Sequence, residues 1–229
     1  YGDMCSRMDA VAVVSQSCEE MLQGQLPELA DKLVCIPNML DDETIRQKAA
    51  NSPYTGDALH IVSVGRLAPE KHFENIIPAA KALLETGTDF TWHIVGDGSE
   101  HARLDSLIAE NNLKDHVMLE GSKANPYPYI KYADLFVHPS YVESQGLTVL
   151  EAMALGVPCV VTKSRGPCEF IEDGVNGLLT EQSPESLTEK VLTILNDKEL
   201  YQQIKENTKC PEQFRPDQVM KQIEALIDE

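Results

Sequence analysis

The residues best suited to chemistry lie in residues 139–158, where a loop runs into a predicted helix that begins near Gly146. The first amides of a helix have no partner inside the helix, so those of Gly146, Leu147 and Thr148 would point out of its amino end. Such an end attracts anions, because the free N–H groups and the helix dipole both favour negative charge. The segment therefore predicts a seat for a phosphate group.

Two carboxylates flank this seat. Glu143 precedes the turn and Glu151 lies about one turn inside the helix, so we expect both to face one cleft from opposite sides. Carboxylates bind phosphate poorly but accept hydrogen bonds from sugar and ribose hydroxyls, so the pair favours a nucleotide sugar over a free nucleotide. The alternative is that Glu143 only complements the helix dipole and that Glu151 is a solvated helix residue.

An earlier loop supplies positive charge. Gly65 permits a tight turn at the end of a strand, and Arg66 and Lys71 follow just before a helix is expected. The planar fork of an arginine, the point charge of a lysine and nearby amides together match a diphosphate. In the alternative interpretation this loop is solvated and Arg66 pairs with Glu70.

Two further loops give weaker signals. Residues 94–100 contain glycines, Gly98 among them, that would let the backbone approach a ligand. The complete Gly-x-Gly-x-x-Gly pattern is lacking, so no nicotinamide site is predicted. Residues 162–169 add Lys163 and Arg165 and are, taken alone, typical of a surface loop.

The elements that must position these loops alternate along the chain. Continuously apolar runs predict strands at residues 11–15, 33–36, 60–64, 91–95, 117–120, 135–138, 158–162 and 177–179. Amphipathic stretches predict helices at residues 73–86, 100–110, 147–155, 184–195 and 217–227. Strands that are apolar on both faces favour a parallel sheet covered by helices on both sides. We therefore predict an α/β fold with a doubly wound, Rossmann-like sheet.

Ligands of such sheets bind at the carboxyl ends of the strands. The loops with unusual residues follow Val64, Val95, Glu120, His138 and Thr162, which end five of the predicted strands. The charges of these loops are therefore expected to meet at one edge of the sheet, where they would complement a sugar diphosphate.

Composition excludes several other classes. The formal net charge is −18, which disfavours a surface for nucleic acid or anionic lipid. No run approaches the ~18 apolar residues of a membrane-spanning helix, so no integral membrane segment is expected. The six cysteines form no Cys-x-x-Cys pair and no Cys/His group with zinc spacing, so reduced thiols and no metal site are expected. The first residues, Tyr-Gly-Asp-Met-Cys, do not resemble a signal peptide.

Residues 37–58 are polar and irregular in pattern and look like a connection between two units. The strand, helix and further strand before them are too little to close a domain. We therefore expect residues 1–56 to be the tail of a truncated N-terminal domain with the interdomain linker. Residues 57–229 would form the ligand-binding Rossmann-like domain with C-terminal helices.

Glu143 and Glu151 are separated by seven residues within Pro-Ser-x-x-Glu-Ser-x-Gly-Leu-x-x-Leu-Glu-Ala-Met-Ala-x-Gly-x-Pro. This segment resembles the E-x7-E motif of the family-4 retaining glycosyltransferases with the GT-B fold. Similar elements occur in order around Val64-Gly65-Arg66-Leu67 with Lys71, and in residues 95–98, 133–140 and 166–178. The resemblance covers roughly residues 9–195 and implies that the chain is the C-terminal half of a GT-B fold.

The resemblance implies catalytic roles for three residues. Arg66 and Lys71 would neutralise the donor diphosphate and stabilise it as a leaving group in place of a metal ion, so no metal or other cofactor is implied. Glu143 would hold hydroxyls of the donor sugar near the reacting carbon. Since the leaving phosphate would take the proton of the acceptor, Glu143 need not be a nucleophile, and the carboxylate geometry of glycosidases does not apply.

The resemblance also implies binding roles. Glu151 would accept hydrogen bonds from the ribose, and the amides at Gly146, Leu147 and Thr148 would bind sugar or phosphate. The loops at Gly98 and at Ser122 and Lys123 would frame the base. The tight turn at Gly65 would bring the backbone close to the donor.

The implied reaction is transfer of a hexose from a UDP-, GDP- or ADP-sugar to a carbohydrate, lipid-linked or other hydroxyl acceptor, in polysaccharide or glycoconjugate biosynthesis. The missing N-terminal domain would supply the acceptor site. It would also attach a cytoplasmic enzyme to the inner face of the membrane. Two alternatives stay open, namely a GT-B epimerase of nucleotide sugars and a non-catalytic nucleotide-sugar-binding module.

Two positions depart from the family pattern. Gln145 stands where the family often has an aromatic residue, so the wall on the sugar side would differ. Asn38 is followed by Met-Leu-Asp rather than Gly-Val-Asp, which affects the expected geometry of the linker.

Overall fold

The computed structural model describes residue 5 and residues 7–228. The start of the chain, on which the prediction of no signal peptide depends, includes residues 1–4, which lie outside the described residues. The two predicted parts, 1–56 and 57–229, also extend over the undescribed residues 6 and 229. Among the helices of the described residues, none is long and apolar enough to cross a membrane.

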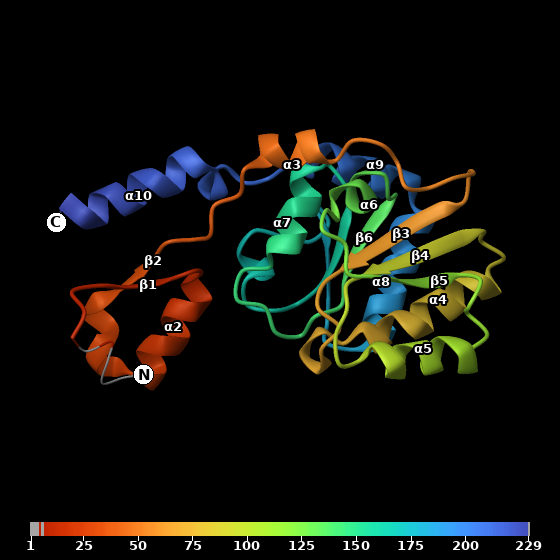
Figure 1. Cartoon of the computed structure of the whole chain (residues 1–229), viewed down its shortest axis with the longest axis horizontal. Helices are drawn as coiled ribbons and strands as arrows, with labels where there is room; N and C mark the ends of the chain where they lie inside the picture. The colour runs from red at the N-terminus through yellow and green to blue at the C-terminus, as the bar shows by residue number, and fades with distance from the viewer. Residues whose placement is uncertain (1–4, 6, 229) are drawn as a thin grey trace.

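A six-stranded sheet forms the centre of the molecule (Figure 1). Its strands are β3 (Leu59–Val64), β4 (Phe90–Val95), β5 (Val117–Gly121), β6 (Leu135–His138), β7 (Cys159–Thr162) and β8 (Leu178–Thr180). They lie in the order β5-β4-β3-β6-β7-β8, and every neighbouring pair is parallel. Each strand overlaps a range expected from the apolar runs. The predicted doubly wound α/β sheet is therefore confirmed.

Helices cover both faces of this sheet. The helices α4 (Ile76–Glu85), α5 (His101–Glu110), α8 (Pro184–Asn196) and α9 (Lys198–Asn207) share one core, to which β3 contributes Ile61. The helices α3 (Asp42–Lys48), α6 (Tyr127–Lys131) and α7 (Leu147–Ala154) belong to the opposite core, to which β3 contributes Val62 and Val64 (Figure 1). Successive side chains of a strand point to opposite faces, so one apolar run supplies both cores.

A small N-terminal unit (residues 7–35) lies beside the main sheet (Figure 1). Its strands β1 (Val11–Val13) and β2 (Leu33–Cys35) pair in parallel, and α2 (Gln16–Gln25) connects them. The unit has its own apolar cluster, built from Val13, Leu29 and Leu33.

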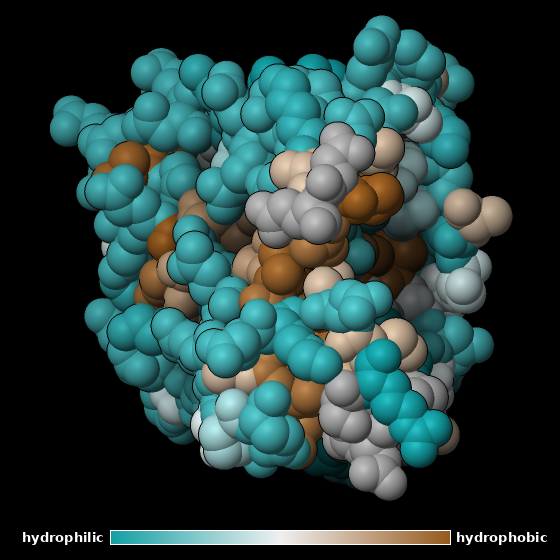
Figure 2. Space-filling view, turned by 90° about the vertical axis from the view of Figure 1, so that its left-hand side faces the viewer, coloured by the Kyte–Doolittle hydropathy of each residue, from teal (hydrophilic) through white to brown (hydrophobic). Residues whose placement is uncertain are grey.

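The C-terminal helix α10 (Pro216–Asp228) leaves the main body and runs toward the same end of the molecule as the N-terminal unit (Figure 1). Figure 2 looks onto this end and shows apolar side chains gathered between polar ones. Exposed apolar residues occur in both elements, namely Met21 of α2 and Met220 and Ile227 of α10.

The linker is where the sequence prediction is wrong. Residues 37–58 were expected to be irregular, yet they contain α3, whose first turn is capped by the Asp41 carboxylate accepting from the Thr44 amide at 2.9 Å. One turn later Ile45 is buried in the core beside α7, and Arg46 donates to the Ala154 carbonyl at 3.0 Å. A single buried apolar residue gives no detectable periodicity in the sequence. The helix forms because it is stabilised by the packing of α3 on α7, which the local sequence does not reveal.

Two other helices, α6 and α9, are additional to the expected ones. Helix α6 is only five residues long and contains two tyrosines and a proline, so its sequence carries little helical signal. Helix α9 is mostly polar, and Ile204 is its buried residue. The other predicted helices are found within one to three residues of their expected limits, the first of them opening with a 3₁₀ turn at Phe73–Asn75.

We expect Ile45→Ala to lower the free energy of unfolding by about 2–5 kcal/mol, because it removes a buried side chain that packs α3 onto the sheet. Gln47→Ala in the same helix is the matched control, since Gln47 is exposed, and should change stability by no more than about 0.5 kcal/mol. Urea denaturation measures both. Equal, negligible effects would show that α3 is not docked.

Candidate active site

The candidate site lies where the strand order reverses, between the neighbouring strands β3 and β6. In open parallel sheets this point leaves a crevice at the carboxyl ends of the strands. Two adjoining cavities of about 420 and 280 Å³ occupy it, and both are lined by Val64, Gly65 and Arg66. Four of the five loops that the sequence singled out, those after Val64, Val95, Glu120 and His138, therefore meet in space.

The larger of these two, here called the central cavity, gathers most of the predicted site residues. Those on its wall are Gly65, Arg66, Lys71, Glu143, Gly146, Leu147 and Thr148. Helix α7 begins directly after Gly146, which adopts a left-handed conformation with φ +82°, and no side chain caps this end. The first amides of α7 are thus available at the cavity wall, as an anion seat requires.

Glu143 is the buried charge of the site. Its side chain is 13% exposed, and its Oε1 atom is bound by Lys71 Nζ and by His138 Nε2, the latter at 2.9 Å. Burial alone would raise the pKa of Glu143, but the hydrogen bonds and charges of His138 and Lys71 lower it to about 2. Glu143 is therefore a carboxylate at neutral pH and acts as a hydrogen-bond acceptor.

Arg66 lines both cavities, but its guanidinium pairs with Glu70 Oε1 at 2.9 Å. This is the contact that the alternative interpretation of the loop proposes. The Arg66 side chain is 72% exposed, so the pair is weak and its partner can be exchanged. Lys71 differs, because its side chain is 20% exposed and held against Glu143.

The smaller cavity has Ser122 and Lys123, from the loop after β5, on its wall. Lys123 Nζ lies 3.3 Å from Glu120 Oε2, and Glu120 also contacts His93 Nδ1 at 2.9 Å and the Tyr129 hydroxyl at 3.2 Å. Although burial favours its neutral form, the hydrogen bonds from His93 and Lys123 lower the pKa of Glu120. Lys123 is thus held by an ionised carboxylate at the edge of the cavity.

Gly98 lies close to the site but is not a wall residue of either cavity. A Cβ atom at this position would lie 2.3 Å from the Leu67 carbonyl oxygen, so the close approach of two loops requires glycine here. Its observed role is to let the loops after β3 and β4 touch.

Glu151 lies apart from Glu143. It lines neither cavity, and its carboxylate is 3.4 Å from the Tyr127 hydroxyl of α6. Burial raises the pKa of Glu151 to about 7, an effect that the Tyr127 hydroxyl only partly offsets. In this structure Glu151 is a half-buried carboxyl whose raised pKa leaves it partly protonated at neutral pH, and the Tyr127 hydroxyl is its hydrogen-bond partner.

The wall or partner residues that were not predicted as site residues include Val14, Asn38, His138, Ser144 and Gln145. His138 could have been predicted as a site residue, because a polar residue at the end of an apolar strand indicates a side chain at the carboxyl edge of the sheet. Gln145 and Asn38, the two departures from the family pattern, bind each other. The Gln145 Oε1 atom accepts from the Asn38 amide at 2.8 Å and from Nδ2 at 2.9 Å, and Gln145 Nε2 donates to the Asn38 carbonyl at 3.0 Å.

The loop after β7 contacts the N-terminal unit. The Glu169 carboxylate accepts from the Gln16 amide at 3.2 Å, from the Ser17 amide at 2.8 Å and from the Ser17 hydroxyl at 2.7 Å. These groups form the first turn of α2, whose free amides favour a carboxylate. Glu169 therefore joins the unit to the edge of the sheet that carries the site.

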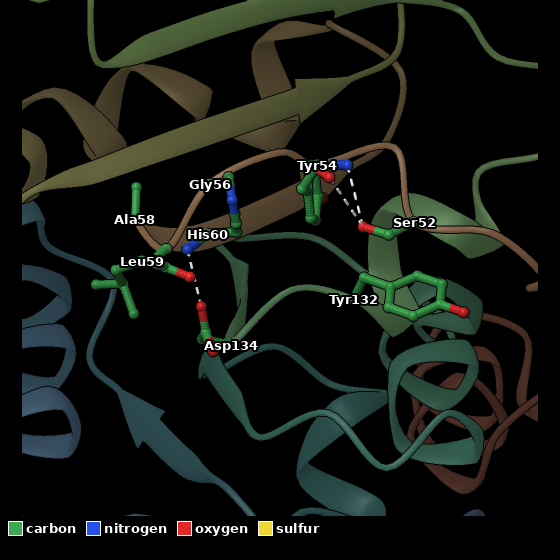
Figure 3. Close-up of a pocket in the computed structure, with 9 residues that line it drawn as sticks. Ser52, Tyr54, Gly56, Ala58, Leu59, His60, Tyr132 and Asp134 are labelled. Atoms are coloured by element: carbon green, nitrogen blue, oxygen red, sulfur yellow. Dashed lines mark hydrogen bonds between the residues drawn. The ribbon is translucent and has the colours of Figure 1, made fainter.

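A further cavity of about 480 Å³ lies at the opposite end of β3 and β6 (Figure 3). Its walls include Tyr54, His60 and Asp134 but none of the predicted site residues. The Asp134 carboxylate accepts from the His60 amide at 2.9 Å, and Tyr54 stacks on the His60 ring at 4.1 Å. These contacts connect the linker to the strands at the amino end of the sheet, away from the crevice where ligands bind.

The fold and the site define an α/β protein with a ligand crevice at the switch point of a doubly wound sheet. A family model described as "Glycosyl transferases group 1" matches residues 44–210. The chain belongs to this family.

Individual relatives agree with this assignment. An uncharacterised glycosyltransferase of Methanocaldococcus jannaschii is 30% identical over 195 residues, which are 79% of this chain and 54% of the relative. An N-acetyl-alpha-D-glucosaminyl L-malate synthase of Bacillus anthracis is 30% identical over 169 residues, 72% of this chain and 44% of that protein. The chain thus spans about half the length of these curated relatives.

Among solved structures, Anabaena HepE in complex with UDP superposes with a TM-score of 0.84 at 23% identity, over 99% of this chain and 65% of that chain. At this identity the likeness concerns the fold. It confirms the predicted class, the Rossmann-like α/β architecture of GT-B glycosyltransferases.

We expect Glu151→Gln to stabilise the protein at about pH 8 and to have little effect at about pH 4. The pKa of Glu151 is raised in the folded state, so this side chain lowers the free energy of unfolding at high pH. The loss of stability is absent below the ordinary pKa of 4.5, grows as the pH rises toward 7 and is complete above it. The gain is at most about 3 kcal/mol. Urea denaturation across this range measures it, with exposed Glu189→Gln as the control. A gain that does not depend on pH would contradict the burial of this carboxyl.

We expect Gln145→Ala to release the linker from the site loop. Three hydrogen bonds are lost, each worth about 1 kcal/mol net, so the free energy of unfolding should fall by about 3 kcal/mol. The local readout is amide hydrogen exchange, which should accelerate at Asn38 and stay unchanged in α4. Unchanged protection at Asn38 would show that the linker is fixed by other contacts.

Proposed function

We propose that this chain is the donor-binding part of a retaining, metal-independent glycosyltransferase that uses a nucleotide-diphosphate sugar. The observation that carries the proposal is the central cavity, where Arg66, Lys71 and Glu143 meet the uncapped amino end of α7. Two cations and free amides suit a diphosphate, and an ionised acceptor suits sugar hydroxyls. Membership of the glycosyltransferase group 1 family supports the same reaction class.

Catalysis in this proposal is stabilisation of the leaving group. As the bond from sugar to phosphate breaks, negative charge grows on the diphosphate, and Lys71, Arg66 and the α7 amides line the cavity that would hold it. The acceptor hydroxyl attacks from the same face and passes its proton to the leaving phosphate. Glu143 holds the sugar hydroxyls and forms no covalent intermediate. No metal ion is needed, since the cations of the chain supply the charge.

Lys71 has two partners in this scheme. In the free protein it is bound to Glu143, so donor binding must share or exchange that contact. The exchange is favourable if the diphosphate replaces Glu143 as the acceptor for Lys71 while sugar hydroxyls donate to Glu143. His138 would keep Glu143 ionised throughout, because its contact lies on the same carboxylate.

For the donor we propose a UDP-sugar before a GDP- or ADP-sugar. The solved structure of HepE is a complex with UDP, and the name of the Bacillus anthracis relative includes an N-acetylglucosaminyl group. Ser122 and Lys123 beside the smaller cavity are proposed to frame the base, and Glu151 is proposed to accept from the ribose. The second role requires ionised Glu151, so donor affinity should rise as the pH passes about 7.

The remaining parts of the proposal concern the whole protein. Residues 1–56 would belong to an acceptor-side domain with the linker, and residues 57–229 to the donor domain. The acceptor would be a carbohydrate, lipid-linked or other hydroxyl in polysaccharide or glycoconjugate synthesis, in the cytoplasm or at the inner membrane face. The alternatives are a GT-B epimerase and a non-catalytic nucleotide-sugar-binding module.

The test compares Lys71→Ala and Glu143→Ala with Lys81→Ala, an exposed lysine of α4 that serves as the matched control. In the intact protein we expect transfer to fall by about 10²–10³-fold for Lys71→Ala, as for loss of one charge-stabilising donor elsewhere, and to be unchanged for Lys81→Ala. Circular dichroism checks that each variant is folded. Unchanged transfer in Lys71→Ala would refute the assigned site.

Donor identity and metal dependence are measured by thermal shift with UDP-, GDP- and ADP-sugars, with magnesium or with a chelator. A micromolar ligand at millimolar concentration should stabilise the fold by about 4 kcal/mol. Stabilisation only with magnesium would reject metal independence. Isomerised sugar formed from the donor alone would favour the epimerase, and binding without turnover would favour the module.

A further inference from the structure

A cavity beside the site, larger than the central cavity, is not used by the proposed reaction. It has a volume of about 640 Å³ and is here called the lateral cavity. It shares Glu143 and Ser144 with the central cavity. The remaining wall comes from α2, from residues 141–142, from the loop after β7 and from Gln182. One chamber therefore lies against Glu143 and also touches the N-terminal unit.

An unsatisfied hydroxyl lies in this wall. Ser164 is only 6% exposed, and its Oγ atom has no hydrogen-bond partner among the described residues. Buried polar atoms are nearly always paired, because an unmade hydrogen bond costs about 1–3 kcal/mol. The Oγ atom is itself shielded from solvent, so Ser164 belongs to the wall without offering its hydroxyl to a ligand in the cavity.

An unpaired cation lies next to it. Arg165 lines the same cavity and makes no hydrogen bond or ion pair with any described residue. Two other polar wall groups are already engaged: Lys163 pairs with Glu181, and Gln182 Nε2 donates to the carbonyls of Tyr141 and Lys163. In a chain with net charge −18, a guanidinium without an acidic partner beside a cavity is an available anion site.

The rest of the wall is apolar. Met21 of α2 is 36% exposed, Val142 is 65% exposed, and Tyr141 and Cys168 also line the cavity. Apolar and aromatic side chains cover the C–H faces of a sugar ring, while a guanidinium binds a carboxylate or phosphate through paired hydrogen bonds. The combination is suited to a ligand with both features.

We propose that the lateral cavity is a subsite for an anionic saccharide unit of the acceptor, with Arg165 binding its carboxylate or phosphate. This inference rests on the proposed function, because Glu143 places the cavity next to the reacting sugar. The donor diphosphate belongs to the central cavity, where Arg66, Lys71 and the α7 amides lie. The lateral cavity is therefore assigned to the other substrate.

The test uses the intact protein saturated with UDP, and binding is measured by ligand-observed NMR. The probes are methyl β-glucuronide for a carboxylate, glucose 6-phosphate for a phosphate and methyl β-glucoside as the neutral control. We expect at least one anionic probe to bind about tenfold or more tightly than the glucoside, and the stronger of the two identifies the anion. Equal binding of all three probes would overturn the proposal.

Variants of Arg165 tie the preference to this cavity. Arg165→Ala should remove the anion preference, Arg165→Lys should retain part of it, and Arg103→Ala, an arginine of α5 that is paired with Glu100, should leave it intact. An anion preference that survives Arg165→Ala would overturn the assignment.

Cys168 reports the location independently. It is exposed on the cavity wall, so the preferred saccharide should slow its alkylation by a thiol reagent, read by mass spectrometry. Unchanged alkylation at saturating saccharide would place the ligand elsewhere. UDP affinity is recorded for every variant. If the unmodified protein does not bind UDP, the result counts against the proposed function. If it binds UDP but shows no anion preference, the result counts against the subsite alone.

Discussion

The site depends on one buried carboxylate and on its need for partners. Glu143 is mostly shielded from solvent yet ionised, and an uncompensated buried charge would cost several kcal/mol. Its partners come from two other places in the chain, Lys71 in the loop after β3 and His138 at the end of β6. Satisfying this one charge fixes both loops against each other and keeps the amino end of α7 at the cavity wall.

The same edge of the sheet is tied to the N-terminal unit and the linker. Glu169 binds the first turn of α2, and Gln145 binds Asn38 through three hydrogen bonds. Gln145 stands two residues after Glu143, so the linker is attached to the loop that carries the buried charge. A displacement of the N-terminal unit must break these bonds or move the site loop with it.

Charge is distributed unevenly over an acidic chain. The net charge of −18 disfavours extended polyanions, yet Arg66, Lys71, Lys123 and Arg165 all line cavities at the carboxyl edge of the sheet. A few fixed cations in a cleft contact a bound anion directly. At this short range their attraction outweighs the repulsion from the acidic surface. The acidic surface and a binding site for small anions are therefore compatible.

The sequence by itself determined the strands, most helices and the loops that meet at the site. Those features are local: apolar runs mark strands, Gly146 before an apolar stretch marks the start of α7, and charges after strands mark one edge of a parallel sheet. The helix α3 was not predicted, because its local pattern is weak and the packing of Ile45 beside α7 cannot be read from the sequence.

Only the tertiary structure decided which groups touch. Three contacts join residues that are 24 to 107 positions apart: Glu143 with Lys71, Glu151 with the Tyr127 hydroxyl, and Asn38 with Gln145. The ionisation of the two glutamates diverges for the same reason, because burial acts on both but only Glu143 gains a cation and a histidine. The type of a residue determines the chemistry available to its side chain, and long-range packing determines the neighbours with which that side chain interacts.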